Sequence, residues 1–222
     1  MRVEWYGQSA FALSDGSTTV AIDPFGDMSA LAGRGIQFDY PPIEGLEAGL
    51  LLVTHEHLDH NGVEVVGGEP TILRSTAGRL ESPIGEVLAV ASEHDEEAGT
   101  SRGPNTIFVF DFDGLRVSHF GDFGQKALRE EQATAIGTVD LLILPVGGGP
   151  TIGAAGAAAI VSALSPRWVV PMHYRTHRTG FLEPADEFLG MYENVHEAEG
   201  PSFQTGELPA VEGPLIVVPA AP

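Results

Sequence analysis

The sequence predicts one domain of mixed α and β structure in which strands outnumber helices. Four apolar runs have the composition of buried strands, and each ends on residues that can take part in chemistry. Short segments near the N terminus fit an antiparallel start, and helical patterns are few. With 222 residues, of which 43% are hydrophobic, the chain can bury a large core, so we expect a single domain over residues 1–222.

The first strands are expected as hairpins. Polar turn residues 14–17 separate two of the early segments, and Asp113-Gly114 is a strong hairpin signal between two later ones. The expected strands are Arg2 to Tyr6, Ala10 to Leu13, Thr18 to Ile22, Ile107 to Phe112 and Leu115 to Ser118.

Helices are expected in three places, after the first half of the chain. The alanine-rich stretch from Gly153 to Ala163 has the highest helix propensity, with Thr151 as a candidate cap. The other two are Gln125 to Glu131 and Ala185 to Tyr192. The glycine- and proline-containing stretch from Gly26 to Gly49 has no clear period and is predicted to be an irregular excursion over the site.

The four apolar runs end close to histidine, aspartate or glycine. Because the carboxyl ends of buried strands are where α/β and mixed folds place their sites, we expect a single pocket. The runs are Leu50 to Thr54 before His55, Leu115 to Ser118 before His119 and Asp122, Leu141 to Val146 before Gly147-Gly148-Gly149, and Trp168 to Met172 before His173.

The stretch from Thr54 to His60 crowds three imidazoles and Asp59 into six residues, a pattern that indicates a metal site. The alternative is a polar turn with Asp59 as the N-cap of a helix. Strand-like alternation would place His55 and His57 on one side of the backbone, with Asp59 and His60 beyond the bend.

One loop can therefore supply two neighbouring metal positions. His94 could complete the first and His173 the second, and Asp122 could bridge both ions. His94 could alternatively be a solvated loop histidine. His119 could compete with His94 for the ligand role, but we expect His119 to support the ligands or to lie in the core.

The remaining candidates receive weaker roles. His177 and His196 are expected at the surface, and Arg102 and Asn105 are expected to fix a turn. Free backbone amides in Gly147-Gly148-Gly149 could hold an anionic group at a helix start, although tight-turn geometry also explains the three glycines.

Composition limits the function further. The formal charge of −20 disfavours nucleic acid as a partner, although it equally serves solubility. With no cysteine, a metal must be held by nitrogen and oxygen. The sequence lacks a membrane-spanning run and a signal-peptide pattern, so we expect no membrane partner and a cytoplasmic location.

The spacing His-x-His-x-Asp-His, followed by a distant His, an Asp and a last His, resembles the metallo-β-lactamase superfamily. Five further segments resemble its branch of metal-dependent hydrolases similar to ascorbate-6-phosphate lactonase. They are Trp5 to Phe11, Arg102 to Thr106, His119 to Asp122, Leu144 to Gly148 and Pro171 to Arg175. Two positions of this sequence depart from the branch. Members of the branch often have a histidine where this chain has Gln8, and many have an acidic residue where it has Gly153.

The resemblance implies an α+β fold, an αββα four-layer sandwich with metals at one edge of two sheets. It implies that His55, His57 and His94 hold one metal, that Asp59, His60 and His173 hold the other, and that Asp122 lies between them. An assembly of identical chains also fits the family. Nitrogen and oxygen ligands favour two Zn ions, with Mn or Fe as alternatives.

We therefore predict a dinuclear hydrolase that uses a hydroxide shared by two cations to cleave an ester, lactone or amide bond of a small molecule. Asp59 would orient the hydroxide and take up a proton, and Tyr174, Arg175 and Gly148 would contact substrate. The alternatives are a phosphodiesterase acting on a nucleotide or phospholipid-type substrate and a non-catalytic metal-binding protein.

Overall fold

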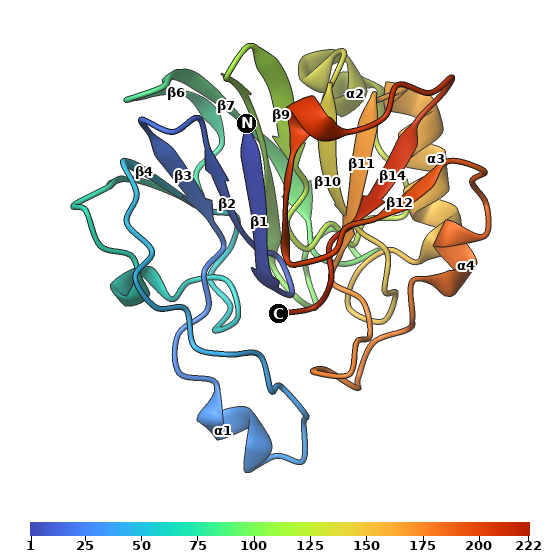
Figure 1. Ribbon diagram of the computed structural model, residues 1–222. Coiled ribbons are helices and arrows are strands. Elements are labelled where there is room, and N and C mark those ends of the chain that lie inside the picture. Colours follow the sequence, from blue (N-terminus) through green and yellow to red (C-terminus); the bar gives the residue numbers. More distant parts are fainter.

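Two β-sheets pack face to face in a computed structural model that describes residues 1–222, except for the side chain of Ala32 (Figure 1). The helices are α1 (Ser29–Ala32), α2 (Glu130–Ile136), α3 (Ala154–Leu164) and α4 (Asp186–Leu189), with short 3-10 helices at Val63–Val65 and Thr205–Glu207. The strands are β1 (Arg2–Gly7), β2 (Ala10–Ser14), β3 (Thr19–Ile22), β4 (Leu50–Val53), β5 (Thr71–Arg74), β6 (Gly78–Ser82), β7 (Gly85–Glu93), β8 (Pro104–Phe112), β9 (Leu115–His119), β10 (Leu141–Pro145), β11 (Trp168–Met172), β12 (Val195–Glu197), β13 (Ser202–Gln204) and β14 (Leu215–Val218).

The first sheet has the order β13-β1-β2-β3-β4-β5. Its side chains alternate between two clusters of buried residues, as the twofold period of a strand requires. In β4, Leu50 and Leu52 belong to the core between the sheets, whereas Leu51 and Val53 belong to a second cluster on the outer face. Strand β4 is therefore buried on both faces of the sheet.

The second sheet has the order β12-β14-β11-β10-β9-β8-β7-β6. Its centre, β9, β10 and β11, is parallel, and every residue of β10 and β11 is buried. Figure 1 shows α2, α3 and α4 on the side of this sheet away from β1, so β10 and β11 are covered on both faces. Continuous apolar runs are typical of such strands.

The α+β sandwich predicted from the resemblance is confirmed. The layer that covers the outer face of the first sheet is mostly irregular. The irregular stretch between β3 and β4 supplies most of that layer, with α1 as its only helical turn. Phe25, Tyr40, Ile43 and Leu46 pack there against the outer side chains of β2, β3 and β4. The predicted excursion is therefore largely a cover for the sheet.

Several expected elements differ in position. The helix expected at Gln125 to Glu131 begins instead at Glu130, because Gln132 caps the backbone of Arg129 and also bonds the side chain of Gln125. The helix expected at Ala185 to Tyr192 is only the four-residue α4. Gly153, not Thr151, is the N-cap of α3. Within the described residues, no helix is long and apolar enough to cross a bilayer.

Five strands from both sheets end just before polar residues that meet at one edge of the sandwich. They are β3 before Asp23, β4 before the His55 loop, β7 before His94, β9 before the Asp122 loop and β11 before His173. The fold thereby brings residues that are up to 150 positions apart in the sequence, Asp23 and His173, to one edge of the sandwich.

Candidate metal centre

The loop after β4 presents His55 and His57 on one side and Glu56 on the other, as the alternation predicted. Nε2 of His55 lies 2.9 Å from Nδ1 of His57. The exposed Glu56 faces away and accepts two hydrogen bonds from the guanidinium of Arg74 on β5, at 2.8 and 2.6 Å. This pair anchors the backbone of the loop and leaves both imidazoles facing the site.

The seven predicted metal ligands converge in three overlapping groups. Within each group, one ligand atom per residue lies within 4.8 Å of the others. The groups are His55 with His57 and His94, His55 with His60 and Asp122, and Asp59 with His60 and His173. The first and third groups coincide with the two metal positions expected from the resemblance, and the middle group connects them through Asp122.

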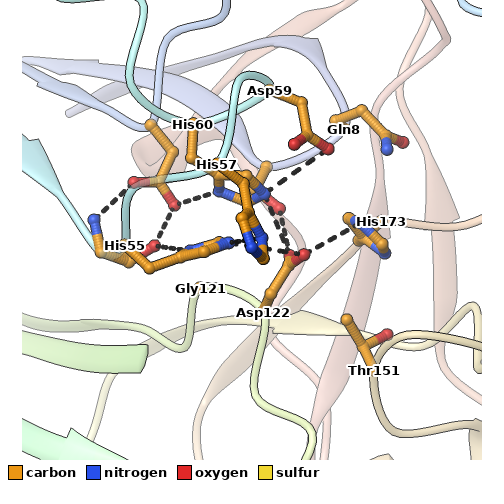
Figure 2. A network of polar contacts seen from close by, with 12 residues as sticks. Gln8, His55, His57, Asp59, His60, Gly121, Asp122, Thr151 and His173 are labelled. Atoms are coloured by element: carbon orange, nitrogen blue, oxygen red, sulfur yellow. Dashed lines mark hydrogen bonds and ion pairs between the residues drawn. The ribbon is translucent and has the colours of Figure 1, made fainter. Parts of the chain in front are cut away.

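Asp122 lies at the centre of the site (Figure 2). One of its oxygens, Oδ2, lies 3.1 Å from Nε2 of His94 and 3.3 Å from Nε2 of His173, while Oδ1 lies 3.2 Å from Nε2 of His60. Burial alone would raise the pKa of Asp122, but His173 and His60 outweigh it and hold that pKa well below its usual range. The carboxylate is therefore ionised and shared by both halves of the site.

Asp23 is a member of the site that the sequence analysis missed. Its Oδ2 lies 2.9 Å from Nδ1 of His60 and accepts a hydrogen bond from the hydroxyl of Thr54 at 2.6 Å, while Oδ1 accepts from the amide of Thr54 at 2.7 Å. Its position at the end of an apolar strand is the same signal that identified His55, Asp122 and His173.

The charge around His60 is unusual for a buried imidazole. Burial lowers its pKa, but Asp122, Asp59 and Asp23 outweigh this effect and raise it well above the usual value. Nδ1 is engaged by Asp23, and Nε2 is buried without a hydrogen-bond partner among the described residues. The carboxylates of Asp23, Asp59 and Asp122 make an anionic pocket around this ring, which is suited to a cation.

His94 and His119 have different environments. Nδ1 of His94 lies 3.0 Å from the carbonyl oxygen of Pro150, which leaves Nε2 facing Asp122. Both nitrogens of His119 are engaged, with the carbonyl of Ser9 and the amide of Gly121, at 3.0 and 3.1 Å. His119 therefore lies in the core and supports the Asp122 loop, as predicted.

The backbone of the Asp122 loop makes a tight turn at Gly121. Gly121 has φ of +54°, and a Cβ there would lie 2.4 Å from Oδ1 of Asn105 and 2.6 Å from Oγ1 of Thr54. The same Asn105 oxygen accepts a hydrogen bond from the amide of Asp122 at 3.0 Å. Asn105 therefore fixes this turn, and only glycine fits beside it.

The residues present fit a pair of divalent cations. Five imidazoles and two carboxylates supply nitrogen and oxygen ligands, the types that Zn, Mn and Fe accept. Burial lowers the pKa of His55, His57 and His173, so these imidazoles are neutral, which is the form that binds metal. Nε2 of His60 is a further buried ligand atom that makes no hydrogen bond to a described residue.

The three residues predicted to contact substrate, Tyr174, Arg175 and Gly148, lie in different environments. Tyr174 is buried, and its ring stacks on Trp5 with 5.6 Å between the ring centroids, so packing accounts for this side chain. Arg175, two positions after His173, is exposed. The amide of Gly148 donates to the carbonyl of Ile152 at 3.1 Å, and that of Gly147 to His173 at 3.1 Å.

The hypothesis of free amides at this glycine turn is therefore corrected for Gly147 and Gly148, whose donors are used within the chain. Of the remaining predictions, His177 is exposed and His196 is half-buried. The amide of Arg102 donates to Asp95 in a turn, at 2.7 Å.

Comparison with known proteins agrees with this geometry. Residues 2–173 match the family described as the β-lactamase superfamily domain. The chain belongs to the β-lactamase superfamily. A metal-dependent hydrolase of Thermococcus kodakarensis is 32% identical over 207 residues, which cover 79% of this chain and 85% of that protein.

Two further relatives extend the comparison. A metal-dependent hydrolase of Thermococcus onnurineus is 34% identical over 202 residues, covering 79% of this chain and 85% of the relative. A crystal structure from Thermotoga maritima, described as a candidate Zn-dependent hydrolase of the metallo-β-lactamase superfamily, has a TM-score of 0.78 and 27% identity, with 99% of both chains covered. Within the superfamily, this chain is therefore a metal-dependent hydrolase.

Proposed function

We propose that this superfamily member is a dinuclear hydrolase of small-molecule esters, lactones or amides. His55, His57 and His94 would hold one divalent ion, Asp59, His60 and His173 a second, and Asp122 would bridge them. The observation that carries the proposal is the position of the Asp122 carboxylate, 3.1 Å from His94 and 3.3 Å from His173. Zn is the favoured metal, with Mn and Fe as alternatives for a nitrogen and oxygen ligand set.

When bound, two such ions would lower the pKa of a water towards neutrality and polarise the carbonyl under attack. The protein's own groups hold the geometry. Asp23 fixes the ring of His60 through Nδ1, and Pro150 fixes that of His94. Neither imidazole is then free to turn its Nε2 away from Asp122.

Asp59 is suited to hold and transfer a proton. Its Oδ2 lies 3.7 Å from Nε2 of His60, and 22% of its side chain is exposed, whereas the site carboxylates of Asp122 and Asp23 are almost fully buried. A carboxylate that faces both the site and solvent can accept the proton of the attacking water and release it to bulk water.

A small substrate fits the surroundings of the site. A cavity of about 440 Å³ is lined by Asp95, Lys126, Pro150 and Thr151 among others, and none of the proposed ligands lines it. It adjoins the first group of ligands through Pro150, whose carbonyl contacts His94. Cavities of this size bind small molecules. The net charge of −20 disfavours a long polyanion.

The test is a substrate panel on chelator-treated protein reloaded with Zn, Mn or Fe. Esters, lactones, amides and phosphodiesters would be compared side by side. We expect cleavage of the esters, lactones or amides. His57→Ala should reduce the rate of this cleavage about 100-fold or more, because a metal ligand is lost. His177→Ala, which removes an exposed imidazole, is the matched control.

Unchanged hydrolysis by His57→Ala would contradict the proposal. Cleavage of phosphodiesters alone would replace the substrate class while retaining the metal centre.

A further inference from the structure

Gln8 is a buried side chain with no partner. It is 0% exposed, and neither Oε1 nor Nε2 of its carboxamide makes a hydrogen bond to a described residue. A buried unpaired amide is costly, so a glutamine at this point calls for a polar partner that the protein acquires in its working state. The proposed function assigns no role to this residue.

The backbone aims Gln8 and His173 into the same part of the site. Both residues adopt left-handed conformations, with φ of +49° and +50°, which non-glycine residues rarely accept. The carbonyl of Gln8 accepts hydrogen bonds from the indole of Trp5 at 2.9 Å and from the amide of His173 at 3.3 Å. Figure 2 shows the two side chains on the same side of the site, near Asp59.

One ring nitrogen of His173, like the carboxamide of Gln8, lacks a hydrogen-bond partner. Its Nδ1 is buried without a hydrogen-bond partner, and its Nε2 lies 3.3 Å from Oδ2 of Asp122. The other three buried imidazoles among the proposed ligands each have an oxygen within hydrogen-bonding distance of Nδ1. These oxygens are Oγ1 of Thr54 for His55 at 3.1 Å, Oδ2 of Asp23 for His60 at 2.9 Å and the carbonyl of Pro150 for His94 at 3.0 Å.

We propose that Gln8 is the positioning residue for His173, a role that rests on the two-metal site proposed above. The carboxamide oxygen of Gln8 accepts the Nδ1–H of His173 through one water, because the two groups make no direct hydrogen bond. This contact selects the tautomer in which Nε2 carries a lone pair and faces the second metal position. Without it, the Nε2–H tautomer, which donates to Asp122, competes with metal binding.

The experiment compares Zn binding by the full-length chain and three variants, using a chromophoric chelator as competitor. Gln8→Leu removes the acceptor and keeps a similar volume, Gln8→Glu keeps an oxygen at the same place, and Gln204→Leu on β13 is the exposed control. We expect Gln8→Leu to weaken the second Zn equivalent about 10- to 100-fold and to leave the first unchanged. Gln8→Glu should restore binding of the second equivalent.

Long-range ¹H–¹⁵N spectra of the metal-free protein give an independent result. The His173 ring should be protonated at Nδ1 in the wild type and should shift to the Nε2–H tautomer in Gln8→Leu. An Nε2–H tautomer in the wild type would overturn the proposal even if Gln8→Leu failed to fold. An unchanged second equivalent in Gln8→Leu would overturn it as well.

These outcomes are distinct from failure of the proposed function. A wild-type chain that binds two Zn equivalents and cleaves none of the substrates would contradict the hydrolase, whereas the tautomer of His173 would still test Gln8.

Discussion

Nδ1 of His60 lies 2.9 Å from Oδ2 of Asp23, although the two residues are 37 positions apart. Both side chains are fully buried, and Asp23 also bonds the amide and hydroxyl of Thr54. One carboxylate therefore orients a proposed ligand and fixes the start of the loop that carries His55. The end of β3 and the start of the loop after β4 are therefore held together by this carboxylate, beneath the proposed metal positions.

Asp23→Asn should weaken metal binding about 10- to 100-fold, because an amide of the same shape is a poorer acceptor for the Nδ1–H of His60. Competition titration with a chromophoric chelator measures this change. Asp15→Asn, which alters an exposed turn aspartate, is the control and should bind metal as the wild type does. Wild-type affinity in Asp23→Asn would show that the His60 contact has no bearing on the metal.

Asp122→Asn should reduce occupancy at both metal positions, whereas His57→Ala should affect only the first. The reason is that Asp122 is within 3.3 Å of ligands from both groups, and His57 belongs to one group. Elemental analysis after dialysis gives the metal content per chain. A chain that loses one metal in Asp122→Asn would mean that this carboxylate does not bridge.

Gly121→Ala should destabilise the protein by about 3 kcal/mol or more, because the new Cβ would overlap Asn105 and Thr54 in a left-handed backbone. Urea unfolding measures the loss. Gly114→Ala is the matched control: its φ is +73°, but no atom lies within 4 Å of the added Cβ, so only about 1 kcal/mol should be lost. Equal losses in the two variants would exclude the overlap as the cause.

The stability of the metal-free protein should fall as the pH decreases from 7 to 5. Burial lowers the pKa of His55, His57, His119 and His173 in the folded protein, while in the unfolded chain they titrate near their usual value of about 6.5. Below that pH the unfolded state binds more protons, so this contribution is complete above it and is lost as the pH falls.

His60 acts in the opposite direction, because its raised pKa favours proton binding in the folded state and its contribution is lost at high pH. Four groups oppose one, so the free energy of unfolding should decrease by about 1 kcal/mol or more per pH unit between pH 6 and 5. Urea titrations at several pH values measure the slope. Constant or rising stability towards pH 5 would contradict the assignment of neutral imidazoles.

The apolar runs predicted the convergence of His55, Asp122 and His173, whereas the ligand role of His94 rested on the His55–His60 cluster and on the family resemblance. Histidine and aspartate follow buried apolar runs, and the carboxyl ends of such strands meet at one edge in this class of fold. Asp23 follows the same rule after β3, but the sequence around it contains no histidine that would mark it as a site residue. Its role depends on a contact with His60 across 37 residues, which no local pattern encodes.

The sequence analysis missed β7, whose buried residues are spread along nine positions, and several elements whose formation depends on partners. β12, β13 and β14 are three or four residues long, and β13 pairs with β1 at the other end of the chain. β5 and β6 carry mostly exposed or half-buried residues and lack an apolar run. The start of α2 is set by the contacts of Gln132 with Arg129 and Gln125, not by helix propensity.

Anomalous diffraction from crystals of the Zn-loaded protein is the most direct test of the central claim. The account predicts two Zn peaks, one bound by His55, His57 and His94, the other by Asp59, His60 and His173, with the Asp122 carboxylate between them. A single peak, or two peaks that Asp122 does not contact, would contradict it.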